Sequence, residues 1–481
     1  RSGTQITREV IEAGTAGGGA LRVVGRAGTG VDNIDLKAAT ERGVIVANAP
    51  TSNCIAAAEH TVALMTSLAR NIPQADGAMR RGEWERHRFT GVALVDKTLG
   101  VVGIGRVGSE VAKRARGLGM EVVAYDPYFP AERAAAMGVP LLSLCEVLEQ
   151  SDFISLHAPL TDGTRNLINR ETIEWMRSGA YLINAARGGL VDEAALLEAL
   201  DSGRLAGAAL DVFSQEPPRN NPLVGHPRVI ATPHLGASTV EAQEGVSLEV
   251  AEAVLAALRG EVVSSAVNAP MVPPETLASL APYMDLAERL ARLVVQLSPA
   301  GPQEVRVTYS GDAAGTGDTR LLKAAVIKGL LEPISEQRVN AVNADLVAQQ
   351  RGLCIIEEKR PAFENWPDSI IIRVTNGESH EVQGAISRGQ PHVVRIDTLW
   401  IDLELNGCIL LCHNQDRPGM IGQVGTVLGR EQVNISFMQV GRDHPRGQAV
   451  MAIGLDEPPP KELLAEIEAI PDISQALLVR I

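Results

Sequence analysis

The chain has 481 residues, of which 45% are hydrophobic and only 3% aromatic, and its formal net charge is −14. A chain of this length predicts about three to four domains, with cores built from Ala, Val, Leu and Ile. It has no run of Lys or Arg that would predict nucleic-acid binding, and no apolar stretch or signal peptide that would predict a membrane protein or export. The five cysteines lack CxxC spacing, so we expect free thiols and a cytoplasmic location.

The start of the chain predicts a small α/β segment. It contains a helix over 6–13, strands near Val23 and Val44, and a long Ala-rich helix over 54–70. Because an α/β domain rarely begins in this way, we expect further residues ahead of Arg1.

From residue 98 to 232, short apolar runs alternate with helical patterns. Buried strands separated by helices are typical of a parallel, doubly wound sheet. The predicted strands are 99–103, 121–125, 153–157, 180–184, 207–212 and 229–232. A further helix at 239–259 follows the last strand. Its place predicts that the chain returns to the first domain, which would then be discontinuous.

A glycine fingerprint follows the first of these strands. Gly103, Gly105 and Gly108 lie between that strand and a predicted helix, and Asp126 ends the next strand. The glycines allow a tight turn and a close approach of the backbone to a pyrophosphate, whose charge the helix N-terminus stabilises. Asp126 can accept hydrogen bonds from ribose hydroxyls and would repel a 2′-phosphate. The pattern therefore predicts a dinucleotide site that prefers NAD to NADP.

Three polar residues follow the later strands of the predicted sheet. Arg187 comes after the fourth strand, Glu216 lies in the loop after the fifth, and His234 lies just past the last. The carboxyl ends of parallel strands meet at one crevice, where ligands of open α/β sheets bind. There Arg187 would bind a substrate carboxylate, His234 would exchange a proton with the substrate, and Glu216 would raise the pKa of His234. We expect no metal, because the sequence has no cluster of metal-ligand residues.

Four runs of sequence carry a resemblance to a known family, namely 26–35, 184–189, 211–213 and 233–239. With the glycine fingerprint they resemble the D-2-hydroxyacid dehydrogenases, and among these the long form of the D-3-phosphoglycerate dehydrogenases. The resemblance implies NAD-dependent oxidation of 3-phospho-D-glycerate to 3-phosphooxypyruvate, the first step of L-serine biosynthesis. It implies an α/β fold, with a Rossmann doubly wound parallel sheet inserted in a flavodoxin-like substrate domain. The family carries further sequence ahead of the position of Arg1, so the resemblance implies that the first domain is incomplete here.

The resemblance also implies particular site residues. The NAD contacts would come from Thr29, Gly103, Gly105, Arg106, Val107, Gly108, Asp126, Ala158, Ala185, Ala186, Arg187, Asp211, His234, Leu235, Gly236 and Ala237. Asp211 would meet the nicotinamide carboxamide. The substrate contacts would come from Arg1, Arg26, Gly28, Arg86 and Arg187. For Arg86 two interpretations stay open, a phosphate ligand, in this subunit or its neighbour, and a solvated charge at a helix end.

Beyond the sheet the sequence predicts two more domains. Prolines at 270–274 mark a boundary, and a mixed α+β stretch follows it. Segment 408–481 predicts β-α-β-β-α-β, the order of a ferredoxin-like unit. By resemblance these are an ASB-like intervening domain and an ACT domain. The predicted domains are a substrate-binding domain in two parts (1–48 and 237–268), an NAD-binding domain (49–236), the intervening domain (269–405) and the ACT domain (406–481).

The ACT resemblance implies a regulatory ligand. By analogy with the family it would be serine, bound between paired ACT domains with Asp416 and Asn434 as contacts. We therefore expect a homodimer or homotetramer. The alternative is an ACT domain that serves assembly alone.

Two other functions are compatible with the catalytic residues. One is a glyoxylate or hydroxypyruvate reductase of the same superfamily, although such enzymes are usually shorter and lack the C-terminal segment. The other is an NAD-sensing transcriptional corepressor, which would be expected to carry disordered tails and a groove for partner peptides.

Overall fold

The computed structural model describes residues 4–17, 19–270, 272, 274–298, 301–315, 318–335, 338–362 and 366–481. The chain divides into two compact units. One contains Arg26–Gly30 and Asn48–Glu252, and the other contains the residues before Arg26, Val31–Ala47 and Ala253–Ile481. Among the helices described, none is both long and apolar enough to cross a membrane.

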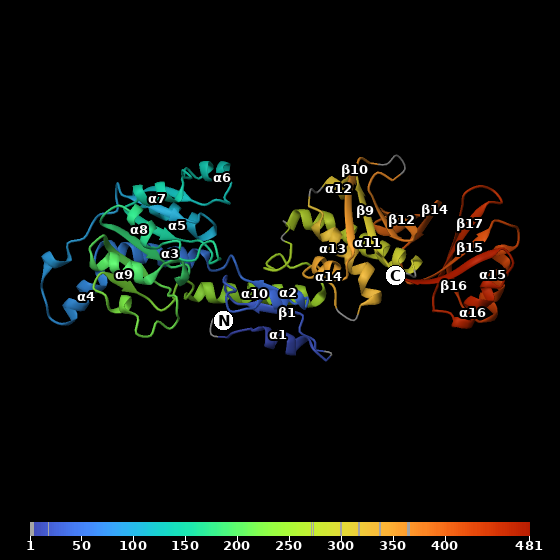
Figure 1. Ribbon diagram of the computed structural model, residues 1–481, viewed down its shortest axis with the longest axis horizontal. Coiled ribbons are helices and arrows are strands. Elements are labelled where there is room, and N and C mark those ends of the chain that lie inside the picture. The colour runs from blue at the N-terminus through green and yellow to red at the C-terminus, as the bar shows by residue number, and fades with distance from the viewer. Residues whose placement is uncertain are drawn as a thin grey trace. The chain divides into compact units, whose positions relative to one another are not determined.

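The first unit is built on a six-stranded parallel sheet (Figure 1). Its strands are β3 (Thr98–Val102), β4 (Glu121–Tyr125), β5 (Phe153–Leu156), β6 (Ala180–Asn184), β7 (Leu205–Leu210) and β8 (Val229–Ala231). They lie in the order β4-β3-β5-β6-β7-β8, and every pair is parallel. All six predicted strands are confirmed. Strands β3, β5 and β7 are apolar runs that are buried on both faces, as in doubly wound sheets, whereas the edge strand β4 begins with the exposed Glu121.

Helices cover both faces of this sheet. They are α3 (Cys54–Ala69), α5 (Arg106–Gly117), α7 (Leu144–Gln150), α8 (Arg170–Trp175) and α9 (Glu193–Asp201). Helix α4 (Ile72–Arg80) follows α3 and contacts it, and α6 (Ala131–Ala136) follows β4. Apolar residues of α3 and α5 share one buried cluster with the sheet, while those of α7, α8 and α9 share the other. Polar caps fix where helices begin: Ser143 forms a capping box at α7, and the Asp192 carboxylate accepts two amide hydrogen bonds at α9.

The small first domain has a two-stranded sheet of β1 (Val23–Arg26) and β2 (Ile45–Asn48), with α1 (Arg8–Thr15) and α2 (Leu36–Glu41). The predicted helix over 6–13 is present but begins two residues later. After α10 (Val240–Arg259) the chain returns to β2. Val267 donates its amide to the carbonyl of Val46 over 2.7 Å, and the Asn268 side chain accepts the amide of Val46 at 2.9 Å. The chain after α10 thus pairs with β2, while the predicted domain boundaries stay a prediction.

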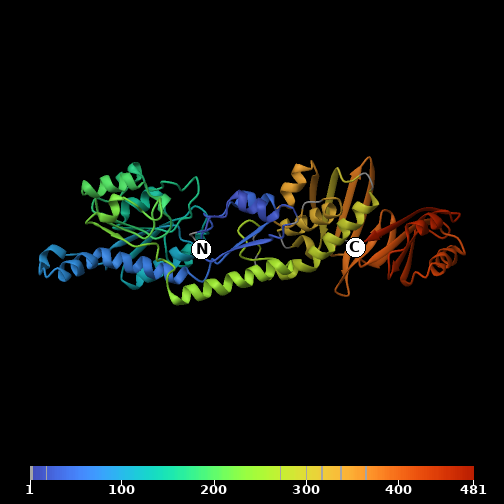
Figure 2. The ribbon, with the colours of Figure 1, turned by 90° about the horizontal axis from the view of Figure 1, so that it is seen from below.

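An antiparallel-rich sheet of six strands follows. Its strands are β9 (Glu304–Ser310), β10 (Cys354–Arg360), β11 (Ser369–Asn376), β12 (Glu378–Ser387), β13 (Gln390–Ile396) and β14 (Leu399–Glu404). The helices are α11 (Pro274–Leu297), α12 (Asp312–Gly315), α13 (Arg320–Leu331) and α14 (Ala344–Gln350). Figure 2 shows α11 running along this sheet, and its leucines join the buried core.

The sequence-based prediction for this sheet was incomplete, since it had only four of the six strands. It missed β10 and β12. Strand β10 is a sheet edge whose side chains are mostly exposed, and β12 begins with the polar run Glu378–Glu381. Strands of this kind lack the apolar alternation by which a strand is recognised.

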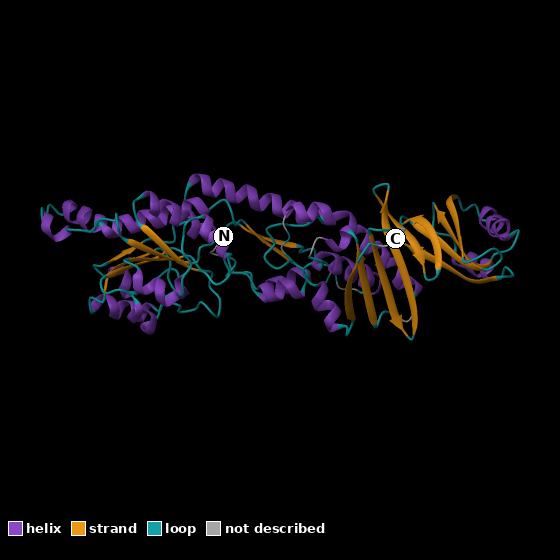
Figure 3. Ribbon diagram, turned by 90° about the horizontal axis from the view of Figure 1, so that it is seen from above, coloured by secondary structure: helices purple, strands orange, loops and turns teal. Residues whose placement is uncertain are grey.

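The C-terminal sheet has four strands (Figure 3). In chain order its elements are β15 (Cys408–Gln415), α15 (Met420–Arg430), β16 (Ile435–Arg442), β17 (Gln448–Leu455), α16 (Lys461–Glu468) and β18 (Ile473–Arg480). The strands lie in the order β16-β17-β15-β18. The predicted β-α-β-β-α-β order is confirmed.

Candidate functional site

The loop between β3 and α5 has the geometry of a dinucleotide cradle. Gly103 has φ +92°, and a Cβ placed on it would lie 2.8 Å from the carbonyl carbon of His157. A Cβ on Gly108 would lie 2.1 Å from the Gly103 oxygen, so this glycine lets helix and loop pack closely. Gly105 differs, because a Cβ there would meet no atom within 4 Å. Its surface is open, and a pyrophosphate could approach the backbone there.

Two further features of this loop fit NAD. Helix α5 begins at Arg106, and its cap residue Gly105 has no side chain to occupy the first amide groups, which are left for an anion. Asp126 lies just after β4, and its carboxylate accepts the amides of Ile104 at 3.1 Å and Tyr128 at 3.0 Å. These bonds hold an acidic group beside the cradle, where adenosine ribose hydroxyls would lie.

His234 and Glu216, which the sequence predicts as the proton-transfer pair, are joined by a hydrogen bond. The Nδ1 atom of His234 donates to Oε2 of Glu216 over 2.7 Å. This hydrogen bond raises the pKa of His234, against the opposing effect of burial. Burial acts to raise the pKa of Glu216, but the hydrogen bond and the charge of His234, together with the backbone amide of Phe213, outweigh burial, so the pKa of Glu216 lies below its usual range. Glu216 is therefore a carboxylate, and the Nε2 atom of His234 is left for a substrate hydroxyl.

Arg187 follows β6, and the side chain of Asn184, three residues earlier, holds its backbone in place. The Asn184 side chain donates to the carbonyl of Arg187 at 2.9 Å and accepts the amide of Ala186 at 3.1 Å. A Cβ on Gly188 would lie 1.9 Å from the backbone carbon of Phe213, so only glycine permits this contact with the loop that leads to Glu216. The positive charge of Arg187 acts to lower the pKa of His234. Arg187, Glu216 and His234 thus share one electrostatic environment.

The carboxylate of Asp211 is buried and faces the loop that carries His234. It accepts the amides of Leu235 at 2.7 Å and Gly236 at 2.8 Å. Sequence reasoning assigned this residue to the nicotinamide carboxamide, and that contact stays a prediction. It missed two further residues that touch the carboxylate, His60 and Thr232. The signal was present, since His60 is a rare polar residue on the buried side of an Ala-rich helix.

The other predicted residues lie in several places. Near the cradle, Thr29 donates to the side chain of Asn53 at 2.8 Å, and Gly28 has φ +143°. A Cβ on Gly28 would lie 2.6 Å from a guanidinium nitrogen of Arg26, so these two substrate candidates are packed together. Arg86 begins a single 3₁₀ turn and lines a shallow groove made only by its own segment, 84–88.

The remaining cofactor candidates lie at three places. Ala158 follows β5 and packs against Gly103. Ala185 and Ala186 follow β6, and Val107 belongs to the first turn of α5. Leu235 and Gly236 donate to Asp211, and Ala237 follows them. Arg1 lies outside the described residues.

The two predicted effector contacts lie at opposite ends of the C-terminal sheet. Asp416 follows the Gln415 end of β15, whereas Asn434 precedes β16, whose first residues align with the Cys408 end of β15. Strand β15 has 8 residues, and at about 3.3 Å per residue its ends lie ~25 Å apart. Within one chain the two side chains therefore do not form one site. Asp416 pairs with Arg442 at 3.0 Å, and Asn434 donates to Asp456 at 2.6 Å.

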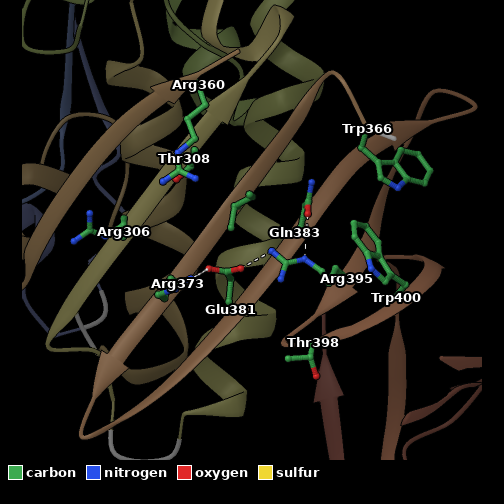
Figure 4. Close-up of a pocket in the computed structure, with 11 residues that line it drawn as sticks. Arg306, Thr308, Arg360, Trp366, Arg373, Glu381, Gln383, Arg395, Thr398 and Trp400 are labelled. Carbon is green, nitrogen blue, oxygen red and sulfur yellow. Dashed lines mark hydrogen bonds and ion pairs between the residues drawn. The ribbon is translucent and has the colours of Figure 1, made fainter. Parts of the chain in front are cut away.

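The second unit has a cavity of about 660 Å³ on the sheet of β9–β14. Figure 4 shows Glu381 joined to Arg373 and Arg395. Glu381 pairs with both Arg373 and Arg395, and a second carboxylate, Glu358, pairs with two more arginines, Arg306 and Arg360. Glu381 thus links arginines of the two neighbouring strands β11 and β13, and Glu358 links Arg306 of β9 to Arg360 of its own strand, β10. The residues that line this cavity include none of the predicted catalytic residues.

Comparisons with known proteins match each part of the chain. A model of the D-isomer specific 2-hydroxyacid dehydrogenase NAD-binding domain matches residues 62–236. A model of the D-3-phosphoglycerate dehydrogenase intervening domain matches 279–397, and a model of the ACT domain matches 409–472.

Individual relatives match over the full chain. D-3-phosphoglycerate dehydrogenase 3, chloroplastic, of Arabidopsis thaliana is 52% identical over 100% of this chain and 84% of its own length. D-3-phosphoglycerate dehydrogenase of Methanocaldococcus jannaschii is 45% identical over 100% of this chain and 91% of its own. Among solved structures, D-lactate dehydrogenase from Aquifex aeolicus, complexed with NAD and lactic acid, is 31% identical, with a TM-score of 0.51 over 55% of this chain and 84% of that one.

Proposed function

Because the chain belongs to the D-3-phosphoglycerate dehydrogenase family, we propose that it oxidises 3-phospho-D-glycerate to 3-phosphooxypyruvate with NAD, the first step of L-serine biosynthesis. One observation carries the chemistry, namely the 2.7 Å hydrogen bond between His234 and Glu216 at the edge of the sheet that also carries Arg187. A charged arginine, a polarised imidazole and a dinucleotide cradle are the groups that oxidation of a 2-hydroxy acid requires.

Each side chain has a distinct task in this reaction. The planar guanidinium of Arg187 binds the substrate carboxylate with two parallel hydrogen bonds and so orients C2. His234 accepts the hydroxyl proton at Nε2, and the carboxylate of Glu216 stabilises the imidazolium that results. NAD, when bound, supplies the acceptor for the hydride that leaves C2. In the reverse direction the imidazolium returns the proton to the carbonyl oxygen.

Steady-state rates with a panel of acids test this proposal. The purified chain would be assayed with 3-phospho-D-glycerate and D-lactate in the oxidative direction, and with 3-phosphooxypyruvate, hydroxypyruvate and glyoxylate in the reductive direction, each with NAD or NADP coenzymes. We expect the phosphorylated substrates with NAD coenzymes to have the highest kcat/KM. A higher value for glyoxylate or hydroxypyruvate would assign the chain to the reductases instead.

We further propose that serine is the ligand of the ACT domain and that Asp416 and Asn434 contact it. A carboxylate can pair with the amino group of an amino acid, and an asparagine side chain offers both a donor and an acceptor. Since these residues lie at opposite ends of one sheet, the site requires Asp416 of one copy and Asn434 of another. The proposal therefore includes a homodimer or homotetramer, which sedimentation would measure.

We also propose that the enzyme works in the cytoplasm. All five cysteines are free thiols, and this fits a reducing compartment. Cell fractionation with an antibody to the native protein tests the location, and recovery in an organelle fraction would refute it.

A further inference from the structure

The loop that carries His234 is anchored almost entirely to one residue. Asp211 accepts the amide of His234 with its backbone carbonyl, at 2.9 Å. Its carboxylate accepts the amides of Leu235 and Gly236 and the hydroxyl of Thr232, the last over 2.6 Å. Four residues of the loop from Thr232 to Gly236 thus donate hydrogen bonds to Asp211.

A residue of helix α3 in turn contacts Asp211. The Nε2 atom of His60, on helix α3, donates to Oδ1 of Asp211 at 3.1 Å and lies 3.3 Å from the hydroxyl of Thr232. The side chain of Asp211 is 0% exposed and that of His60 only 19%. A buried carboxylate is stable only while donors surround it, so the imidazole completes the set that keeps this charge in place.

The conformation of His234 explains why the loop needs an anchor. His234 has φ +57°, in the left-handed region that residues other than glycine seldom adopt. Such a conformation persists where neighbouring contacts determine it, as the bonds to Asp211 do here. Released from them, the backbone would relax, and the imidazole would leave its position against Glu216.

We propose that His60 is a positioning residue for catalysis, which acts through Asp211 and Thr232 to hold His234 in its reactive orientation. The proposal rests on the proposed function for the identity of the reaction, but its contacts are independent of the substrate. In the contacts of the described residues His60 touches Asp211 and Thr232 but neither Arg187, Glu216 and His234 nor the glycine cradle. Its larger effect should therefore appear in turnover, with a smaller effect on NAD binding through the predicted contacts of Asp211, Leu235 and Gly236.

Three variants test the proposal. His60→Ala removes the donor, and a displacement of the catalytic group by about 1 Å can cost ~100-fold in rate. We therefore expect kcat to fall by about 10- to 100-fold, with a smaller change in the Kd for NADH. His60→Gln places an amide nitrogen close to the position of Nε2, so it should restore most of kcat. His226→Ala is the matched control, because it removes another histidine–aspartate pair, to Asp201 at 3.3 Å, before β8 rather than after it.

A measurement independent of activity separates this proposal from the proposed function. Hydrogen–deuterium exchange of the peptide that contains Leu235 and Gly236 should become at least 10-fold faster in His60→Ala and stay slow in His60→Gln and His226→Ala. If the wild-type chain does not oxidise 3-phospho-D-glycerate but the exchange behaves in this way, the proposed function fails and the positioning role stands.

Other outcomes would overturn the positioning role. One is a His60→Ala enzyme with wild-type kcat and wild-type exchange in the loop. Another is a His60→Gln enzyme that is as impaired as His60→Ala. Should His60→Ala fail to fold, the Thr232→Val variant tests the proposal in its place. This substitution removes the other side-chain donor to Asp211 with little change of volume. We expect it to lower kcat and to speed loop exchange, and unchanged values of both would refute the proposal.

Discussion

At the scale of single residues, the charge of Glu216 sets the basicity of His234. The two side chains are 37% and 43% exposed, so solvent reaches the pair, yet their 2.7 Å contact still moves the two pKa values in opposite directions. His234 must be neutral to accept a proton and protonated to donate one. The pH dependence of the reaction in each direction therefore reports on this pair.

His234→Ala removes the group that we propose takes the hydroxyl proton. General acid–base catalysis contributes at least ~100-fold, so we expect kcat to fall by that factor or more. His234→Asn is the companion variant, because asparagine tolerates the left-handed backbone that His234 adopts. Both variants should bind NADH as the wild type does, as measured by fluorescence titration. A kcat near the wild-type value in either of them would rule out His234 as the base.

Glu216→Gln removes the charge that raises the pKa of His234 but keeps a group that can accept a hydrogen bond. The pKa of His234 should then fall. Oxidation needs the neutral imidazole, so the acid limb of its pH profile should move to lower pH. Reduction needs the imidazolium, so its activity should be lost at a lower pH than in the wild type. Profiles of kcat/KM in both directions measure this, and limbs that do not move would contradict the assigned role of Glu216.

Asp126→Ala tests the choice of cofactor. The carboxylate beside Ile104 and Tyr128 should repel a 2′-phosphate, so its removal should narrow the NAD/NADP ratio of kcat/KM. The same variant should also weaken NAD binding, because ribose acceptors are lost. A wild-type enzyme that already uses both cofactors equally would show that Asp126 does not select between them.

At the scale of elements, the turn from β3 into α5 uses its glycines for different purposes. Gly108 permits close packing of the helix on the loop, while Gly105 leaves the backbone open to a ligand. Structural and cofactor-binding glycines can therefore be told apart by what an added methyl group would meet.

A pair of glycine variants makes this difference measurable. Gly108→Ala would place a methyl group against the Gly103 carbonyl and should destabilise the unit by about 1–3 kcal/mol, as overpacking does. Gly105→Ala should leave the melting temperature unchanged and weaken NAD binding. Gly117→Ala, at the other end of the same helix, meets no atom within 4 Å and serves as the control. Equal loss of stability in the first two variants would show that both glycines are structural.

At the scale of the whole molecule, the dehydrogenase part is joined to an intervening domain and an ACT domain. The ACT domain implies an effector ligand, and an effector changes a rate only if it binds one conformational state better than another. The separation of Asp416 and Asn434 on one sheet means that any site containing both requires two copies of the chain.

Serine inhibition of the full chain tests this arrangement. We expect serine to lower the rate of the wild type, and Asp416→Ala or Asn434→Ala to abolish inhibition while kcat without serine stays unchanged. A mixture of Asp416→Ala and Asn434→Ala chains should regain some inhibition by serine. In a mixed dimer, one of the two serine sites keeps both Asp416 from one chain and Asn434 from the other. The opposite result is that no amino acid lowers the rate of the wild type and that calorimetry detects no binding of an amino acid. In that case the ACT domain serves assembly alone.

The sequence by itself determined the parts of this protein that local patterns encode. The six parallel strands are short apolar runs, and their regular alternation with helical patterns identified them. Placing Arg187, Glu216 and His234 near one crevice needed only the rule that parallel strands present their carboxyl ends at one edge. The glycine spacing indicated the cradle in the same way.

Only the tertiary structure decided which side chains meet. No spacing along the chain places His60 against Asp211, because helix α3 precedes β3 by sequence but packs beside β7 and β8. The polar strands β10 and β12 are defined by their hydrogen-bonded neighbours rather than by their own residues. Asp416 and Asn434 appear close in sequence, yet strand pairing carries them to opposite ends of a sheet. Contacts between segments distant in the chain depend on packing, and a local pattern of residues does not contain that information.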